Sequence, residues 1–339
     1  MIYDQVTKLS LYKNTGKKKR YSKIIGIVLL FAILIGILFI INQNENTIYS
    51  INIEGTYPVT IIATEDFGSS ILFDQELIIE SGESTIDILQ KVATVTTSYG
   101  GGYVGSINGI KSQYSSENGE KEDWLYFING MLASVGANMY KPHPGDIIHW
   151  DFHDWSSNRA VTAIIGEYPE PFIHGYNGKN AETSIVYADE YYETAFKLQN
   201  SLEKQGVTAS MKHFEDLTDG EKSGHNLILI DTYENDLISE LNVNADQLGW
   251  FIEYDKNQLI TYDETGAKDL TFDYGGVILA IQNTWNPKGN WHCENVIWVI
   301  SGITTDDVTA AANLLIENNE EIKHCVSLIV VNGIVYKVP

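Results

Sequence analysis

Short runs in which apolar and polar residues alternate dominate positions 58–155 and predict β-strands there. Val59–Ala63 and Ile71–Ile79 are rich in β-branched residues, and a Phe-Gly-Ser-Ser turn separates them. Tyr103–Gly109 and Trp124–Gly130 each end in Asn-Gly, a pair that readily takes positive φ and closes hairpins. The alternation therefore predicts a series of short strands joined by tight turns.

The run Asp146–Trp155 has two unlike faces. Apolar side chains alternate with imidazoles and a carboxylate, so that Ile148, Trp150 and Phe152 share one face and His149, Asp151 and His153 share the other. Histidine and carboxylate suit zinc, but the two histidines would stand about 13 Å apart on a regular strand. We therefore expect a solvated polar face, with a structural metal as the alternative.

A helical stripe lies between these strands. Ser84 is a favourable N-cap, and apolar residues follow at helical spacing, at Ile86, Leu89, Val92 and Ala93. The order strand, strand, helix, strands is typical of a β-grasp arrangement, an α+β fold in which one helix packs across a sheet. We assign residues 58–155 to such a domain.

Residues 156–182 contain Pro169, Pro171, Gly175 and Gly178, which predict a linker. Within it, Val161–Ile165 is either a last strand or part of the linker.

Strands alternate with helices from residue 183 onward. We expect strands at 184–187, 207–213, 227–231, 276–281, 296–300, 326–331 and 334–338, and helices at 191–202, 235–241 and from Thr304. The runs 276–281 and 296–300 are continuously apolar, as in strands buried on both faces. Residues 183–339 therefore predict an α/β domain with a mainly parallel sheet.

A continuous apolar segment precedes all of these elements. Ile24–Ile41 holds eighteen apolar residues in a row, long enough to span a bilayer, and five Lys or Arg stand at 17–23. The positive-inside rule places residues 1–23 in the cytoplasm. We expect a single-pass signal anchor at 24–41 in the cell membrane, a stalk at 42–57 and extracellular domains beyond it, with a cleaved signal peptide as the alternative.

The charge is divided in the same way. The net charge is −23, yet residues 1–41 carry seven basic residues and one acid, which leaves 15 basic and 44 acidic residues in the remainder. An exterior this acidic argues against nucleic acid and against anionic membrane surfaces as partners.

Four segments carry a family resemblance. They are GESTIDILQKVA, GGYVGSINGI, DWLYFINGMLASVGANMY and HPGDIIHW, and together they resemble the C-terminal domain of the transcobalamin, intrinsic factor and haptocorrin group and its bacterial relatives. The resemblance covers roughly residues 55–155 and implies a β-grasp fold. In those carriers the domain covers one side of cobalamin, opposite a helical barrel; here a membrane anchor stands in place of the barrel.

The resemblance also implies a ligand face. It would place a flat corrinoid against Trp124, Tyr126, Phe127, Gly130 and Met131, with Tyr103 and Tyr140 flanking it. No resident cofactor is implied beyond such a bound corrinoid. Large apolar groups are frequent in this stretch, and an exposed patch of them usually indicates binding.

The chain has two cysteines, and both lie in the predicted extracellular part. Cys293 and Cys325 each follow a histidine and each precede a predicted strand. Starts of neighbouring parallel strands lie close together, so a disulfide is the preferred reading. Free buried thiols and a metal site are the alternatives.

Catalytic motifs of known spacing are absent. The sequence contains no Gly-x-Ser-x-Gly and no His-Glu-x-x-His, and the Ser301–Thr305 turn lacks the glycines and lysine of a nucleotide site. Glu167, Glu170 and His174 lie in the predicted linker, where they could face a cleft. We expect no enzymatic activity.

Two functions fit these observations. One is a membrane-anchored extracellular binding protein that captures a corrinoid or a similar molecule and passes it to a transporter. It predicts a shared aromatic cleft between the domains. The other is a structural or interaction component of the cell envelope, which predicts a flat contact surface. An exported hydrolase would need converging carboxylates or histidines in a cleft.

Overall fold

The computed structural model describes residues 55–113, 121–289 and 291–339. The predicted cytoplasmic tail, membrane span and nearly all of the stalk lie outside these residues. No helix among the described residues is long and apolar enough to cross a bilayer. Residues from Glu54 to Pro339 form one compact unit, whose two main sheets are described in turn.

The first sheet has five strands in the order β2-β1-β8-β6-β7. Their bounds are β1 Thr56–Glu65, β2 Ser70–Glu80, β6 Glu122–Ile128, β7 Met131–Leu132 and β8 Ile147–Asp154. β1 and β8 run parallel in the middle of the sheet, and the other neighbours are antiparallel. This part of the chain therefore forms a mixed sheet.

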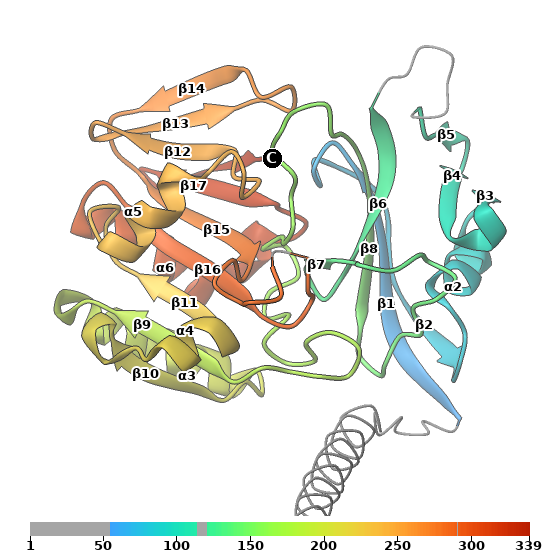
Figure 1. Cartoon of the computed structure of the whole chain (residues 1–339), viewed down its shortest axis with the longest axis horizontal. Helices are drawn as coiled ribbons and strands as arrows, with labels where there is room; N and C mark the ends of the chain where they lie inside the picture. Colours follow the sequence, from blue (N-terminus) through green and yellow to red (C-terminus); the bar gives the residue numbers. More distant parts are fainter. Residues whose placement is uncertain (1–54, 114–120, 290) are drawn as a thin grey trace, which may run out of the picture. The chain divides into compact units, whose positions relative to one another are not determined.

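One face of this sheet is covered by a helix and by a small three-stranded sheet (Figure 1). The covering elements are α2 Thr85–Val92, β3 Val95–Ser98, η1 Tyr99–Gly101, β4 Tyr103–Ile107 and β5 Ile110–Lys111. Ser84 caps α2 as predicted, since its hydroxyl accepts from the Asp87 N–H and the Asp87 carboxylate accepts from the Ser84 N–H. Aromatic pairs fill the sheet face below, with Tyr126 stacked on Trp150 at 4.8 Å.

The second sheet has seven strands in the order β10-β9-β11-β16-β15-β17-β18. Their bounds are β9 Thr183–Tyr187, β10 Ala209–His213, β11 Asn226–Ile230, β15 Gly276–Gln282, β16 Val296–Gly302, β17 Ser327–Val331 and β18 Ile334–Val338. The first four strands in that order are parallel and the remaining neighbours are antiparallel.

The prediction of a mainly parallel sheet is therefore wrong for half of this sheet. The chain passes from β15 to β16 through a loop without a helix, and such a connection joins antiparallel strands. β17 and β18 are joined by a tight turn in which Asn332 has φ +53°. Parallel pairing requires a crossover, and the chain makes one between β9 and β10 with the helix Tyr192–Lys204.

Helices cover both faces of the second sheet. The helices are α3 Tyr192–Lys204, α4 Asp219–Gly224, α5 Asp236–Val243 and α6 Thr305–Glu317, with 3₁₀ turns η2 Asp189–Tyr191, η3 Phe214–Asp216 and η4 Asn319–Ile322. α3 and α6 pack on the face that contains Ile185, whereas α5 packs on the face that contains Val186. The capping box predicted at Thr304 and Asp307 is present.

A further three-stranded sheet was not predicted. It consists of β12 Ile252–Asp255, β13 Gln258–Tyr262 and β14 Lys268–Phe272. Lys256 and Asn257 form the turn between the first two strands, and both have positive φ, 48° and 66°. Asn at such a position was an available signal, since it tolerates the left-handed region.

The predicted linker is a buried layer between the two main sheets. Ile165 is 0% exposed and Phe172 is 2% exposed. The backbone N–H of Ile164 donates to Gly130 O at 2.8 Å, and the N–H of Ile165 donates to Val326 O at 3.3 Å. Val161–Ile165 forms no strand, although Ala163 makes an isolated bridge with Met131. The segment therefore joins both sheets into one packed body.

The backbone of His324 lies so close to two glycines that neither has room for a side chain. One glycine belongs to this layer and the other to the β1–β2 turn. A Cβ on Gly166 would lie 2.5 Å from the His324 nitrogen, and a Cβ on Gly68 would lie 1.7 Å from the His324 oxygen. His324 precedes β17, whereas Gly68 belongs to the β1–β2 turn. The two main sheets can approach this closely only because both positions lack a side chain.

We expect Gly166→Ala to lower the free energy of unfolding by at least about 1–3 kcal/mol, because the new methyl group would overlap backbone atoms. Urea unfolding followed by tryptophan fluorescence measures this change. Gly220→Ala is the matched control, since nothing lies within 4 Å of a Cβ there. Equal unfolding midpoints for the wild type and Gly166→Ala would contradict the close packing.

Candidate functional site

The polar face of β8 is buried, contrary to the expectation of a solvated face. His149, Asp151 and His153 are 1%, 3% and 5% exposed. The alternation of the strand is as predicted, with Trp150 packed toward α2 and its polar neighbours on the other face. The hydrogen-bond partners of this opposite face come from β1, from the β1–β2 turn and from Glu167 of the predicted linker.

Asp151 is the centre of this buried network. Its carboxylate accepts from the Thr64 hydroxyl at 2.5 Å, from the N–H groups of Phe67 and Gly68 at 3.1 and 3.0 Å, and from His153 Nδ1 at 2.6 Å. Burial opposes its charge, but the hydrogen bond and charge of His153 outweigh burial and hold the pKa of Asp151 below its usual value. Asp151 is therefore an ionised carboxylate that fixes the β1–β2 turn.

His149 donates two hydrogen bonds. Its Nδ1 lies 2.5 Å from Glu167 Oε1, and its Nε2 lies 2.7 Å from the Thr64 hydroxyl oxygen. The Thr64 hydroxyl gives its single proton to Asp151, so it can only accept from His149. Both ring nitrogens of His149 therefore bear protons, and the side chain is an imidazolium.

The electrostatics agree with this proton count. Burial alone would lower the pKa of His149, but the charge of Glu167 and the hydrogen bond to it raise the pKa above its usual value. His324 stands edge-on to His149, with ring centroids 5.9 Å apart, and its Nε2 lies 3.4 Å from Asp74. Burial lowers the pKa of His324. One charged and one neutral imidazole thus share this interface.

A hollow of about 420 Å³ opens beside this network. It lies between the β1–β2 turn, the adjoining ends of β6 and β8, the β13–β14 turn and the end of β18. The residues that line it are Asp66, Phe67, Ser69, Glu122, Phe152, His153, Asp154, Glu264 and Pro339. The hollow is therefore formed jointly by both main parts of the described unit.

His153 links the hollow to the buried network. Its Nδ1 donates to Asp151, and its ring stacks on Phe67 with centroids 4.2 Å apart. Among the described residues, no hydrogen bond to its Nε2 is present, so this nitrogen is available to a molecule in the hollow. A carboxylate behind one imidazole nitrogen orients the other, as it does in many binding and catalytic sites.

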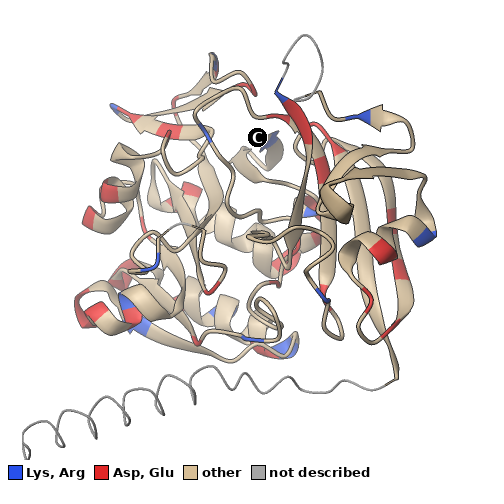
Figure 2. Ribbon diagram, turned by 45° about the vertical axis from the view of Figure 1, so that its right-hand side comes forward, with Lys and Arg blue, Asp and Glu red and all other residues tan. Residues whose placement is uncertain are grey.

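The hollow is strongly acidic. Four of its lining residues are carboxylic acids, and the lining includes no Lys or Arg. Acidic residues, red in Figure 2, are spread over the surface of both parts. Within the described ranges, no group of three or more His, Cys, Asp or Glu is arranged to hold a metal ion. The chemistry of the hollow thus suits a positively charged organic molecule.

The aromatic residues expected to contact a ligand are in the protein interior. Trp124, Tyr126, Phe127, Met131 and Tyr140 are all less than 9% exposed. Trp124 and Tyr126 face Phe152 and Trp150 beneath α2, whereas Phe127 and Met131 belong to apolar clusters shared with the C-terminal sheet. They therefore form no exposed aromatic face.

The two remaining predicted ligand residues, Tyr103 and Gly130, have structural contacts as well, as does Tyr140. The Tyr103 hydroxyl donates to Asp123 at 2.8 Å, and the Tyr140 hydroxyl donates to Asp146 at 3.1 Å. A Cβ at Gly130, where φ is +76°, would lie 2.9 Å from Ile164 O. Asp146 is completely buried, and it also accepts from Asn129 and from the His143 N–H.

The predicted disulfide is wrong, since Cys293 and Cys325 are free buried thiols. Cys293 precedes β16 and Cys325 precedes β17, but β15 lies between those two strands. Two strand spacings amount to about 9.5 Å, and a disulfide requires Cα atoms within about 7 Å. Inserting β15 therefore separates the two cysteines.

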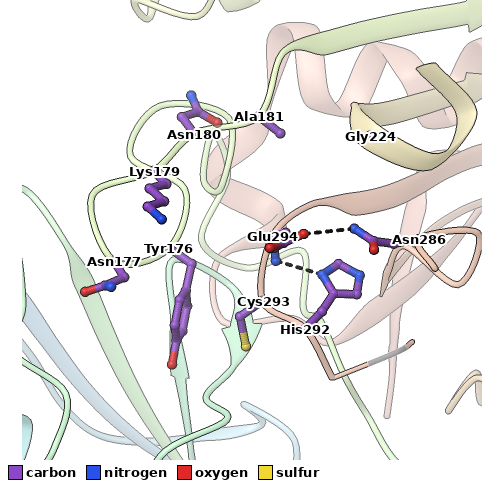
Figure 3. A pocket seen from close by; sticks show the side chains of 10 residues that line it. All are labelled: Tyr176, Asn177, Lys179, Asn180, Ala181, Gly224, Asn286, His292, Cys293 and Glu294. Carbon is purple, nitrogen blue, oxygen red and sulfur yellow. Dashed lines mark hydrogen bonds between the residues drawn. The ribbon is translucent and has the colours of Figure 1, made fainter. Parts of the chain in front are cut away.

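Cys293 lines a second hollow, of about 390 Å³, together with Tyr176 and Lys179 (Figure 3). Burial raises the pKa of the Cys293 thiol, which disfavours the reactive thiolate. Both nitrogens of the adjacent His292 are occupied, since Nδ1 accepts from the Glu294 N–H and Nε2 donates to Asn283 O. This hollow thus offers neither a nucleophile nor a free imidazole.

The other candidates from the sequence also have partners. Glu167 pairs with His149, and Glu170 forms an ion pair with His174. The side chains of Glu167 and Glu170 are both about 3% exposed, so they stabilise the layer between the sheets. The Ser301–Thr305 turn contains the Thr304 cap of α6.

The raised pKa of His149 predicts a pH dependence of stability. A group whose pKa is raised by folding stabilises the fold below its unfolded-state pKa, about 6.5 for histidine, and this contribution is lost as the pH rises through the folded-state pKa. We expect Glu167→Gln to flatten the fall in unfolding free energy above pH 6.5. At pH 6 it should cost about 3–5 kcal/mol, because a buried ion pair is broken.

Chemical denaturation at a series of pH values from 6 to 9 measures both effects. Glu83→Gln is the control, because Glu83 pairs with Lys91 at the surface and no histidine takes part. An unchanged pH slope in Glu167→Gln would show that His149 does not hold its proton through Glu167.

Comparison with known proteins gives a match for one part of the chain. A family model described as a domain of unknown function (DUF4430) matches residues 82–154, which extend from the β2–α2 turn to the end of β8. No curated protein matches the chain.

Two solved structures are similar over about a third of the chain. Haptocorrin in complex with Cbi is 16% identical with a TM-score of 0.26, and the match covers 31% of this chain and 26% of haptocorrin. A Ruminococcus gnavus protein, provisionally described as metal binding, is 9% identical with a TM-score of 0.23, over 29% of this chain and 97% of that protein. The chain thus spans about a quarter of haptocorrin, and scores this low carry no argument about function.

Proposed function

We propose that this chain is a membrane-anchored extracellular binding protein that takes a small, positively charged organic molecule. The site is the acidic hollow between the β-grasp part and the C-terminal part. The observation that carries the proposal is the lining itself, which contains four carboxylic acids and no Lys or Arg. The role is binding without a chemical step.

The lining supports a cation with an apolar body. Carboxylates form strong hydrogen bonds with ammonium and guanidinium groups. Phe67 and Phe152 add ring surface, to which cations are attracted. The volume of about 420 Å³ lies within the range of small-molecule sites, toward its lower end.

The site is held rigidly before any ligand arrives. Asp66, Phe67 and Gly68 have φ of 54°, 56° and 81°, three successive left-handed residues. Non-glycine residues adopt this conformation only where the surroundings hold them, and here Asp151 accepts from two of the three N–H groups. Such rigidity lowers the entropic cost of binding.

Basic residues precede the apolar segment at 24–41. By the positive-inside rule they favour a cytoplasmic N-terminus and place the residues after the segment outside the cell. A binding protein anchored there would collect its ligand outside the cell and present it to a transporter.

A corrinoid is the ligand that the sequence resemblance implies. Five of the side chains expected to contact it are buried, so a corrinoid would need a different face of the molecule. It is therefore included in the test below as a separate ligand.

Isothermal titration calorimetry of the full chain with benzylammonium and with neutral benzyl alcohol tests the proposal, since it gives the Kd of each. We expect the cation to bind at least about tenfold more tightly, a difference of about 1.4 kcal/mol. Glu264→Gln should weaken the cation severalfold, since Glu264 is exposed in a turn and lines the hollow. Asp269→Asn, an exposed acid on β14 outside the hollow, should leave binding unchanged.

Cyanocobalamin and cobinamide are titrated in parallel. Equal affinity for the cation and its neutral analogue would refute a cation site. Corrinoid binding that survives Glu264→Gln would instead support the family-derived ligand at another face. No binding of any of these molecules by the folded chain would favour a structural role in the cell envelope.

A further inference from the structure

A third hollow, of about 280 Å³, lies at the carboxyl ends of the parallel strands of the seven-stranded sheet. Its lining residues are Tyr187, Ala188, Asp189, His213, Phe214, Glu215, Asp231 and Asn235. They come from the ends of β9 and β10 and from the segment after β11, which lie side by side in the sheet (Figure 1). None of them belongs to the acidic hollow described above.

The position of this hollow follows from the topology. The chain forms β9 first, then adds β10 on one side of it and β11 on the other. The connections at the carboxyl ends therefore diverge between β9 and β11. In open α/β sheets, ligands bind in the crevice that this divergence creates.

The lining selects against the phosphates that such crevices often bind. Three of the eight lining residues are acids, and none is Lys or Arg. An anionic ligand would meet uncompensated negative charge there. The ligand must therefore be neutral or cationic.

Hydrogen bonds hold the polar groups of the hollow in fixed positions. Asp231 accepts from the Thr232 N–H at 2.7 Å and from Asn235 Nδ2 at 2.9 Å. His213 Nδ1 lies 2.8 Å from Asp189 Oδ1, and its Nε2 lies 3.3 Å from the Tyr187 hydroxyl. Carboxylates and an amide arranged in this way present several acceptors to the hydroxyl groups of a ligand.

A row of aromatic rings extends from the hollow along α3. The ring of Tyr187 lies 4.7 Å from that of His213 and 6.0 Å from that of Tyr192. Tyr192 and Phe196 stand one helical turn apart, and their rings are parallel within 4° at 6.3 Å. They are 48% and 43% exposed, although large apolar side chains usually avoid solvent.

This row distinguishes an extended ligand from a compact cation. A small ammonium ion would occupy only the hollow and would leave Tyr192 and Phe196 without contact. A chain of sugar rings presents flat C–H faces that pack on aromatic rings and hydroxyl groups that bind carboxylates and amides. We propose that the carboxyl edge of β9, β10 and β11, together with Tyr192 and Phe196, is a binding site for a neutral oligosaccharide.

Isothermal titration calorimetry of the full chain tests this site. The two neutral probes are the N-acetylglucosamine tetramer and cellotetraose. We expect at least one to bind with Kd below about 1 mM, equivalent to about −4 kcal/mol. The corresponding monosaccharide should bind at least about tenfold more weakly, because it cannot contact both the hollow and the row of rings.

The double variant Tyr192→Ala/Phe196→Ala should weaken the tetramer at least about tenfold. Both side chains are exposed, so the fold should be retained. Tyr274→Ala is the matched control, since Tyr274 is 47% exposed and lies outside this site. The control should bind the tetramer as the wild type does.

Three results would overturn the site. They are no binding of either tetramer at about 10 mM by the folded chain, equal affinity of the double variant and the wild type, and equal affinity of monosaccharide and tetramer. Spermidine is titrated as well, and binding of spermidine with no tetramer binding would assign the hollow to cations. The Glu264→Gln variant should leave tetramer binding unchanged, which separates this site from the acidic hollow.

Discussion

The Asp151 carboxylate is the contact on which the described unit depends. It accepts four hydrogen bonds, two of them from the backbone of the β1–β2 turn. That turn meets the backbone of His324 so closely that Gly68 has no space for a side chain. Without a charged acceptor on β8, the N–H groups of two left-handed residues, Phe67 and Gly68, would lack their partner, and the turn that approaches His324 would lose these hydrogen bonds.

The charged groups around Asp151 form one hydrogen-bonded chain within the interior. Glu167 and Asp151 are acids and His149 is an imidazolium between them, connected to Asp151 through the Thr64 hydroxyl. Buried charges are tolerated only when they are paired and fully hydrogen-bonded. Apolar clusters on either side contain Phe127 and Met131 from the first sheet together with strands of the second. The first sheet therefore shares its buried interior with the second.

This packing explains where the hollows lie. The surface that would contact a corrinoid, by resemblance to the vitamin carriers, is occupied by the protein's own side chains. Openings remain where the two parts diverge, beside His153, and at the carboxyl edge of the parallel strands. Both openings are acidic, which matches the excess of acids over bases in the chain. They differ because the rings that extend from the second one, Tyr192 and Phe196, are exposed.

Local sequence determined most elements and their caps, as Ser84 and Thr304 illustrate. It also determined which residues of β8 share a face, because alternation is a property of the strand itself. It could not determine what covers that face. His149, Asp151 and His153 resemble a solvated surface until partners 18 to 175 residues away in the chain are brought against them.

Tertiary structure alone decided the remaining features. The insertion of β15 between β16 and β17 separated the two cysteines, and loop rather than helical connections made half of the second sheet antiparallel. Both depend on which strands pair over long distances, and pairing partners leave no local signature in strands that are apolar on both faces. The sequence thus determined the elements and their faces, whereas packing between distant segments determined burial, charge state and the position of each hollow.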